Sequence, residues 1–171
     1  MISGKSVLGL IPARGGSKRI PLKNLRYFHG KSLLEITIIT ARQSKYLDLI
    51  LVSTDHPEIA QKAASLHCLI LPRPAELSTD SATSESVALH ALQHYPHDLF
   101  CLLQPTSPYR TATDIDTCIE LAPAISYNEA TLRKNGAVYV TDRTCNFTGQ
   151  HHHYFMLASR SLDVDFEQDL A

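Results

Sequence analysis

Short apolar runs alternate with helically periodic segments along most of the chain. Strands are predicted at residues 7–11, 49–53, 68–71 and 99–103, and helices at 32–44, 57–66, 84–95 and 112–121. Strands that alternate with helices form βαβ units and a mainly parallel sheet that helices cover on both faces. The pattern therefore predicts an α/β protein with a three-layer α/β/α arrangement. Ligands of such sheets bind at the carboxyl ends of the strands.

The pattern changes after residue 121. Residues 136–141 and 154–158 predict strands with no clear helix between them, and residues 121–134 have only weak periodicity. The length of 171 residues fits one domain, and a chain of this size buries enough surface to fold without disulfides or a structural metal. We expect residues 1–171 to form a single domain.

Composition excludes several classes of protein. The net charge is −1, with 44% hydrophobic and 19% charged residues, so no overall field attracts nucleic acid or an anionic membrane. No segment approaches the roughly 20 apolar residues of a membrane span, and no signal peptide is visible. The widely spaced cysteines predict buried, reduced thiols: Cys68, Cys101, Cys118 and Cys145. Together these features predict a cytoplasmic protein whose anion sites are local.

A basic, glycine-bearing loop follows the first predicted strand. Arg14, Lys18, Arg19 and Lys23 place four cations within ten residues, with no acid between them. The pair Gly15-Gly16 lets backbone N–H groups approach a ligand as an anion nest. Neither a Walker loop nor a G-x-G-x-x-G pattern is present. The loop predicts a phosphate site, and the alternative is a solvated basic turn.

Several segments, in order, resemble the acylneuraminate cytidylyltransferases, also called CMP-N-acetylneuraminic acid synthetases. The strongest resemblance lies in Ile11-Pro12-Ala13-Arg14-Gly15-Gly16-Ser17-Lys18, followed by Ile20-Pro21 and Lys23-Asn24. Further similar segments are Val52-Ser53-Thr54-Asp55, Arg73-Pro74-Ala75-Glu76-Leu77, Gln104-Pro105-Thr106-Ser107-Pro108 with Arg110, Asn135-Gly136-Ala137 with Tyr139, and Ser161-Leu162-Asp163-Val164-Asp165. The resemblance implies a Rossmann-like fold of the nucleotide-diphospho-sugar transferase type. It also implies transfer of CMP from CTP to a nonulosonic, sialic-type acid with release of pyrophosphate.

The resemblance also implies roles for individual residues. Those implied to hold the CTP phosphates are Arg14, Ser17, Lys18, Lys23 and Asn24. Arg73 and Ser84 would lie at the base and ribose, and Gln104 at the sugar acid. Nucleotidyl transfer requires the pyrophosphate leaving group to be neutralised. The candidate catalytic residues are therefore the cations Arg14, Lys18 and Lys23, together with Asp165, which the resemblance assigns to the metal.

Asp163 and Asp165 form a candidate metal site. Residues two apart in an extended segment point the same way, and two carboxylates suit one Mg²⁺ that takes its other ligands from water and phosphate. The alternative from spacing alone is a pair that caps a helix at 166–170. The resemblance favours the metal site, with Mg²⁺ as cofactor.

Other polar residues are given structural interpretations. His151-His152-His153 is interpreted as a polar turn before a strand, because three consecutive side chains do not converge easily on one ion. Asp55 and Asp80 are interpreted as turn residues or caps.

The chain departs from the family in one region. The relatives carry several dozen more residues before the Asn-Gly-Ala strand, in an element that supports dimerisation and sugar contacts, whereas here residues 123–134 join the two parts directly. This departure indicates an internal deletion. It leaves an intact nucleotide-binding half at about 1–122 and a reduced sugar and metal half at about 123–171. Two hypotheses follow: an active enzyme, or a catalytically impaired CTP-binding remnant. The expected partners are CTP and a nonulosonic acid, without nucleic acid or membrane, in a monomer or weak homodimer.

Overall fold

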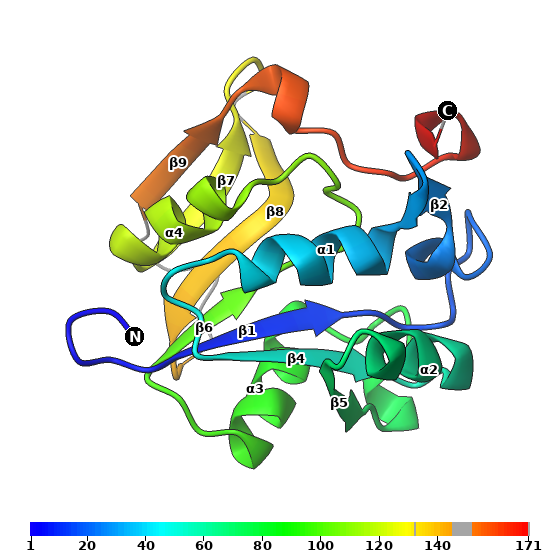
Figure 1. Cartoon of the computed structure of the whole chain (residues 1–171), viewed down its shortest axis with the longest axis horizontal. Helices are drawn as coiled ribbons and strands as arrows, with labels where there is room; N and C mark the ends of the chain where they lie inside the picture. The colour runs from blue at the N-terminus through cyan, green and yellow to red at the C-terminus, as the bar shows by residue number, and fades with distance from the viewer. Residues whose placement is uncertain (132, 145–151, 171) are drawn as a thin grey trace.

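A central sheet organises the computed structural model, which describes residues 1–131, 133–144 and 152–170. Within these residues seven strands form the sheet. In sheet order they are β5 (Leu69–Pro72), β4 (Leu49–Thr54), β1 (Val7–Pro12), β6 (Leu99–Leu102), β8 (Arg133–Asp142), β7 (Ala124–Asn128) and β9 (His152–Met156). All neighbouring pairs are parallel except the two that β8 forms with β6 and β7 (Figure 1). The expected mainly parallel sheet is confirmed.

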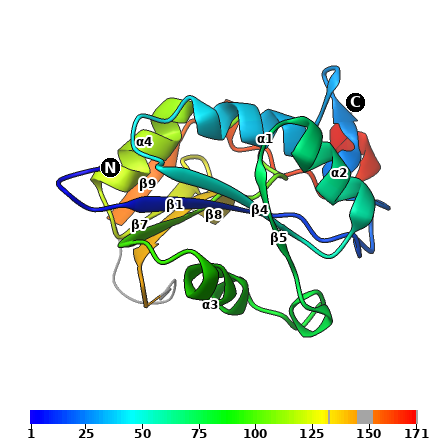
Figure 2. The ribbon, with the colours of Figure 1, turned by 60° about the horizontal axis from the view of Figure 1, so that its bottom comes forward.

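Helices cover both faces of the sheet. They are α1 (Leu33–Arg42), α2 (Pro57–Ser65), α3 (Ser84–His94) and α4 (Ala112–Glu120). Helices α1, α2 and α4 lie on one face and α3 on the other, so the three-layer prediction is confirmed (Figure 2). Short 3-10 turns are η1 (Lys23–Leu25), η2 (Ala75–Leu77), η3 (Ala158–Arg160) and η4 (Glu167–Leu170), and a small hairpin joins β2 (Tyr27–Phe28) to β3 (Lys31–Ser32). No helix in the described part of the chain is long and apolar enough to cross a membrane.

Strand β1 lies inside the sheet, between β4 and β6, and its side chains point alternately to the two faces. Val7 and Ile11 pack into the cluster that holds the apolar stripe of α1, whereas Leu8 and Leu10 pack against α3. Both faces are therefore buried, as the continuous apolar run predicts. Helices α1, α3 and α4 begin at side-chain caps; in α1, for example, Ser32 accepts a hydrogen bond from the Glu35 N–H.

The order of the parallel strands creates a crevice. The chain runs from β1 through α1 to β4 and through α2 to β5, and then returns through α3 to β6 on the other side of β1. The direction of winding reverses between β1 and β6. In open α/β sheets, ligands bind at the carboxyl ends of the strands that flank this reversal.

The region after α4 differs from the sequence expectation. Residues 124–128, which had weak periodicity, form β7, and this strand pairs with β8 on one side and β9 on the other. Strand β9 begins at His152, so His152 and His153 lie in a strand and the predicted turn is wrong for them; His151 lies outside the described residues. No cluster of three metal-ligating side chains occurs among the residues described.

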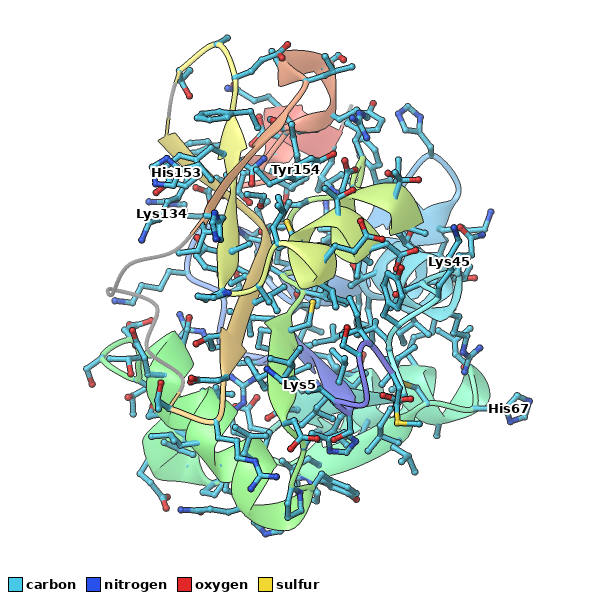
Figure 3. The ribbon with its side chains drawn as sticks, turned by 90° about the vertical axis from the view of Figure 1, so that its left-hand side faces the viewer. Lys5, Lys45, His67, Lys134, His153 and Tyr154 are labelled. Atoms are coloured by element: carbon cyan, nitrogen blue, oxygen red, sulfur yellow. The ribbon has the colours of Figure 1, made fainter. Side chains whose placement is uncertain are left out.

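The side chains of β9 alternate between its two sides, so the histidines in it do not form a turn. Tyr154 points toward α4, where its hydroxyl donates to Asp114 at 2.7 Å, and His153 points to the opposite side (Figure 3). His153 stacks there on Tyr127 with ring centroids 4.5 Å apart. This alternation of sides is that of an ordinary strand.

The cysteines that the structure describes are structural. Cys68, Cys101 and Cys118 are buried free thiols, and burial raises the pKa of Cys101 to about 12. A buried thiol with a raised pKa is a poor nucleophile. Cys145 lies outside the described residues.

Candidate active site

A pocket of about 350 Å³ opens where the winding of the sheet reverses. Pro12 at the end of β1 and Leu102 at the end of β6 line its floor. Every substrate-binding residue expected from the sequence, except Lys18, lines this pocket: Arg14, Ser17, Lys23, Asn24, Arg73, Ser84 and Gln104. The fold thus brings together residues from four separate segments.

A second pocket of about 450 Å³ adjoins the first, and Gly16 and Lys18 line it. The two pockets share Arg14, Ser17, Thr79 and Asp80, so these residues stand at their boundary. Lys18 is therefore close to the other predicted residues, in the adjoining pocket.

The neighbouring turn after β4 holds the basic loop tightly. The Gly15 N–H donates to the Asp55 carboxylate at 2.8 Å, and a Cβ added at Gly15 would lie 2.6–2.9 Å from the His56 side chain. Asn24, which is buried, donates from Nδ2 to the Arg14 carbonyl at 3.0 Å. Glycine is required at position 15 because no side chain fits there. The predicted anion nest lacks the Gly15 N–H, because Asp55 already accepts from it.

One carboxylate holds the first two cations of the loop. Asp80 accepts from Arg14 at 2.8 Å and lies 2.5 Å from the Lys18 ammonium. Arg14 also donates to the Ser78 carbonyl at 3.3 Å. Lys18, and after it Arg14, lowers the pKa of Asp80, so this carboxylate is ionised at neutral pH. The cations thus lie at the pocket with a counter-ion in place.

A second carboxylate holds the last two cations. Lys23 donates to Asp165 at 2.9 Å and to the Val164 carbonyl at 2.7 Å, and Arg19 lies 2.8 Å from Asp165. Lys23 is only 12% exposed, whereas Lys18 is 79% exposed. The hydrogen bond from Lys23 is the main cause of the lowered pKa of Asp165. Lys23 therefore links the pocket to the C-terminal segment.

Arg73 lies at the inner end of the pocket. It is 8% exposed and donates to the Ser53 hydroxyl at 3.1 Å and the Ser53 carbonyl at 2.8 Å. Burial lowers its pKa to about 10, against the opposing effect of Asp55. The guanidinium stays charged at neutral pH and is fixed before any ligand contacts it.

Gln104 is positioned by the residues around it. Arg110 is buried and donates to the carbonyls of Gln104 at 3.0 Å and Ala137 at 2.7 Å. Gly136 has a φ of +74°, and a Cβ there would lie 2.6 Å from the Gln104 Oε1. Arg110 thus supports the loop from inside, and Gly136 leaves room for the amide of Gln104.

The Asp163–Asp165 segment lies outside both pockets but is bonded to the wall of the first. The Val164 N–H donates to the Thr106 carbonyl at 2.7 Å. Asp163 is exposed in its total surface, yet partial burial of its carboxyl raises its pKa, and the charge of Asp165 adds to this effect. The two carboxylates therefore lie close enough to interact, although their contacts differ.

The capping alternative for this pair is not what the structure contains. Asp169, not Asp163 or Asp165, accepts from the backbone N–H groups of Asp165 and Phe166, at 2.8 and 2.7 Å. Asp163 and Asp165 thus do not cap this segment. Carboxylate oxygens suit a hard divalent cation that takes most of its ligands from water and phosphate. Both oxygens of Asp165 are paired with Lys23 and Arg19, so such a cation would share this carboxylate with them or displace one of them.

Residues 8–154 match the family described as cytidylyltransferase. The chain belongs to this family. Among curated relatives, the N-acylneuraminate cytidylyltransferase of Escherichia coli O18:K1:H7 is 40% identical over 116 residues, which are 67% of this chain and 28% of that protein. The CMP-N,N'-diacetyllegionaminic acid synthase of Legionella pneumophila is 39% identical over 124 residues, which are 67% of this chain and 52% of that protein. The resemblance seen in the sequence is confirmed, and the match spans about half or less of these relatives' length.

Solved structures share the fold of this family member. A CMP:2-keto-3-deoxy-manno-octonic acid synthetase complexed with CTP has a TM-score of 0.76 and 16% identity, over 95% of this chain and 94% of that one. Rv0371c of Mycobacterium tuberculosis in complex with manganese has a TM-score of 0.67 and 18% identity, over 96% of this chain and 95% of that one. The Rossmann-like fold of the nucleotidyltransferases is therefore confirmed.

Sequence reasoning missed the residues that arrange the cations. Asp55 and Asp80 lie in turns, as predicted, but they also contact the basic loop across 40 and 66 residues of sequence. The one available signal is that Asp80 is the only acid in the hydroxyl-rich run Ser78-Thr79-Asp80-Ser81. Local spacing does not reveal a contact of that range.

Proposed function

We propose that this chain transfers CMP from CTP to a nonulosonic acid and releases pyrophosphate. The observation that carries the proposal is the single pocket where Arg14, Lys23, Arg73 and Gln104 meet. Both relatives described above are named for such activities. An active enzyme is the reading we adopt, because no observation favours an impaired remnant.

The arrangement of charges suits the reaction. An oxygen of the sugar acid attacks the α-phosphorus in line, and the bond to the β-phosphate breaks. Arg14, Lys18 and Lys23 would neutralise the triphosphate and then the departing pyrophosphate. Arg73 and Ser84 would hold the cytidine, and Gln104 the sugar acid. Arg73 is already positioned by buried hydrogen bonds and Lys23 by partly buried ones, so these two cations need little reorganisation when the charge moves.

We propose that Asp163 and Asp165 hold a divalent cation, Mg²⁺ in this chain. Their carboxylate chemistry supports this, and so does the manganese complex of Rv0371c. A bound cation would supply Lewis-acid catalysis and orient the phosphates. Treatment with EDTA should abolish turnover, and added Mg²⁺ should restore it.

The decisive experiment measures pyrophosphate release with CTP, Mg²⁺ and a panel of nonulosonic acids. We expect release with at least one acid, and calorimetry should show tighter binding of CTP than of ATP or GTP. Equal affinity for the three nucleotides would remove the cytidylyl assignment. The panel should include neuraminate, legionaminate and pseudaminate, because the two relatives named above differ in their sugar acid.

We also propose that the chain is a monomer or a weak homodimer. Each chain would form one domain, with a nucleotide half (1–122) and a reduced sugar half (123–171). Residues 124–128 form β7, and its apolar residues Ala124 and Ile125 are buried in the core, so they cannot contribute to an interface of about 1,200–2,000 Å². Sedimentation at several concentrations should show dissociation at micromolar or higher concentration. A tight dimer with ordinary saturation by a sugar acid would contradict this division.

A further inference from the structure

Asp80 occupies the place where phosphate charge would be expected. Its two oxygens are divided between Arg14 and Lys18, at 2.8 and 2.5 Å. It stands at the boundary between the two pockets. Among the described residues, Asp80 is the ion-pair partner of both cations. A polyphosphate that uses these cations therefore competes with Asp80 for them.

The ion pairs of Asp80 are exposed, so another anion can displace Asp80 from Arg14 and Lys18. Its side chain is 48% exposed and that of Lys18 is 79% exposed, so water screens both pairs. Asp80 lies in the loop between η2 and α3, and the residues that hold it there are polar turn residues. By contrast, the Lys23 ammonium also donates to the Val164 backbone and is nearly enclosed.

We propose that Asp80 is a displaceable counter-ion that competes with triphosphate and pyrophosphate for Arg14 and Lys18. It keeps the two cations in place before the nucleotide binds, and it replaces the pyrophosphate after the transfer. Asp80 thus weakens polyphosphate binding and speeds product release. The inference rests on the proposed function only in taking a polyphosphate as the ligand.

The test compares binding of inorganic pyrophosphate and of CTP, both without metal, by calorimetry. Asp80→Asn keeps the shape and removes the charge, so it should tighten both ligands by about twofold to tenfold, the range expected for losing two exposed ion pairs. The inhibition constant for pyrophosphate in the forward reaction should fall by the same factor. The gain should shrink at high salt, because exposed charges are screened.

Matched variants separate competition from disturbance of the fold. Asp80→Glu restores the charge and should return affinity toward that of the wild type. Glu167→Gln removes another exposed carboxylate, paired with Arg26 at 2.8 Å, and should leave both affinities unchanged. Asp80→Ser provides a second neutral variant, and thermal melting shows whether each variant is folded.

The outcomes are distinct. Unchanged or weaker binding by both neutral variants overturns the inference, and so does a loss of affinity confined to Mg²⁺-containing buffer, which would make Asp80 a metal ligand. If pyrophosphate follows the expected pattern but CTP binds no better than ATP, the cytidylyl assignment fails and the inference on Asp80 stands. If the wild type binds neither ligand, both proposals are overturned.

Discussion

The two ends of the basic loop meet carboxylates in different surroundings. At one end Asp80 holds Arg14 and Lys18 in contact with water, and at the other Asp165 holds Arg19 and a nearly enclosed Lys23. The residue types are the same and the two carboxylates are similarly exposed, but the enclosure of Lys23 and its additional backbone acceptor make the Lys23–Asp165 contact harder to exchange than the contacts of Asp80. An ion pair alone therefore does not show whether a carboxylate holds a cation firmly or can be displaced from it by a ligand. The surroundings of the pair decide this.

The largest expected effect is at the enclosed end. Asp165→Asn should reduce metal-dependent turnover about a hundredfold or more, because a metal acting as Lewis acid supplies several kcal/mol. CTP affinity measured without metal should change far less, since the amide keeps the hydrogen-bonding shape. Steady-state kinetics and metal-free calorimetry measure the two quantities. Normal turnover in this variant would remove Asp165 from the candidate catalytic residues.

The next effect compares the two lysines directly. Lys23→Ala removes a nearly enclosed charge-assisted contact, typically worth about 1.5–3 kcal/mol, so the dissociation constant of CTP should rise at least about tenfold. Lys18→Ala removes an exposed charge and should raise it only about twofold to fivefold. Circular dichroism checks that both variants are folded. Equal losses would show that burial does not distinguish the two ends of the loop.

A smaller and more selective effect is expected beside Gln104. Gly136→Ala would place a Cβ 2.6 Å from the Gln104 Oε1 and should raise the KM for the sugar acid about tenfold without altering CTP affinity. Gly30→Ala is the matched control: its φ of +84° brings the same backbone strain, but no atom lies within 4 Å of the added Cβ. A similar change in KM for both variants would attribute the effect to strain rather than to Gln104.

Most of the fold could be predicted because its signals are local. The apolar runs gave β1, β4, β5 and β6 to within one or two residues, and helical periodicity gave the four main helices similarly well. Strand β7 could not be predicted, because its buried Ser126 breaks the apolar pattern. The Ser126 hydroxyl is accommodated by bonds to Asn135 and Val138, which only the folded sheet provides.

The candidate site, like the fold, could be predicted only in part. The substrate-binding residues implied by resemblance, apart from Lys18, line the first pocket, because each follows the end of a strand or begins a helix, whereas Asp163 and Asp165 lie outside it. Arg110 was grouped with them by sequence, but it supports the loop from within, and burial lowers its pKa to about 10. The partners of the cations could not be predicted, because Asp80 and Asp165 reach them across long separations that no local pattern encodes.

The bond between Lys23 and the Val164 carbonyl joins residues 141 positions apart. Closing so long a loop is entropically costly, and a domain generally folds as a unit. On the ribosome, residues 163–165 emerge only after every strand of the sheet has been made. The basic loop and its cations are therefore synthesised long before the carboxylates proposed for the metal, and the contact that joins Lys23 to Val164 can form only when the last segment is present.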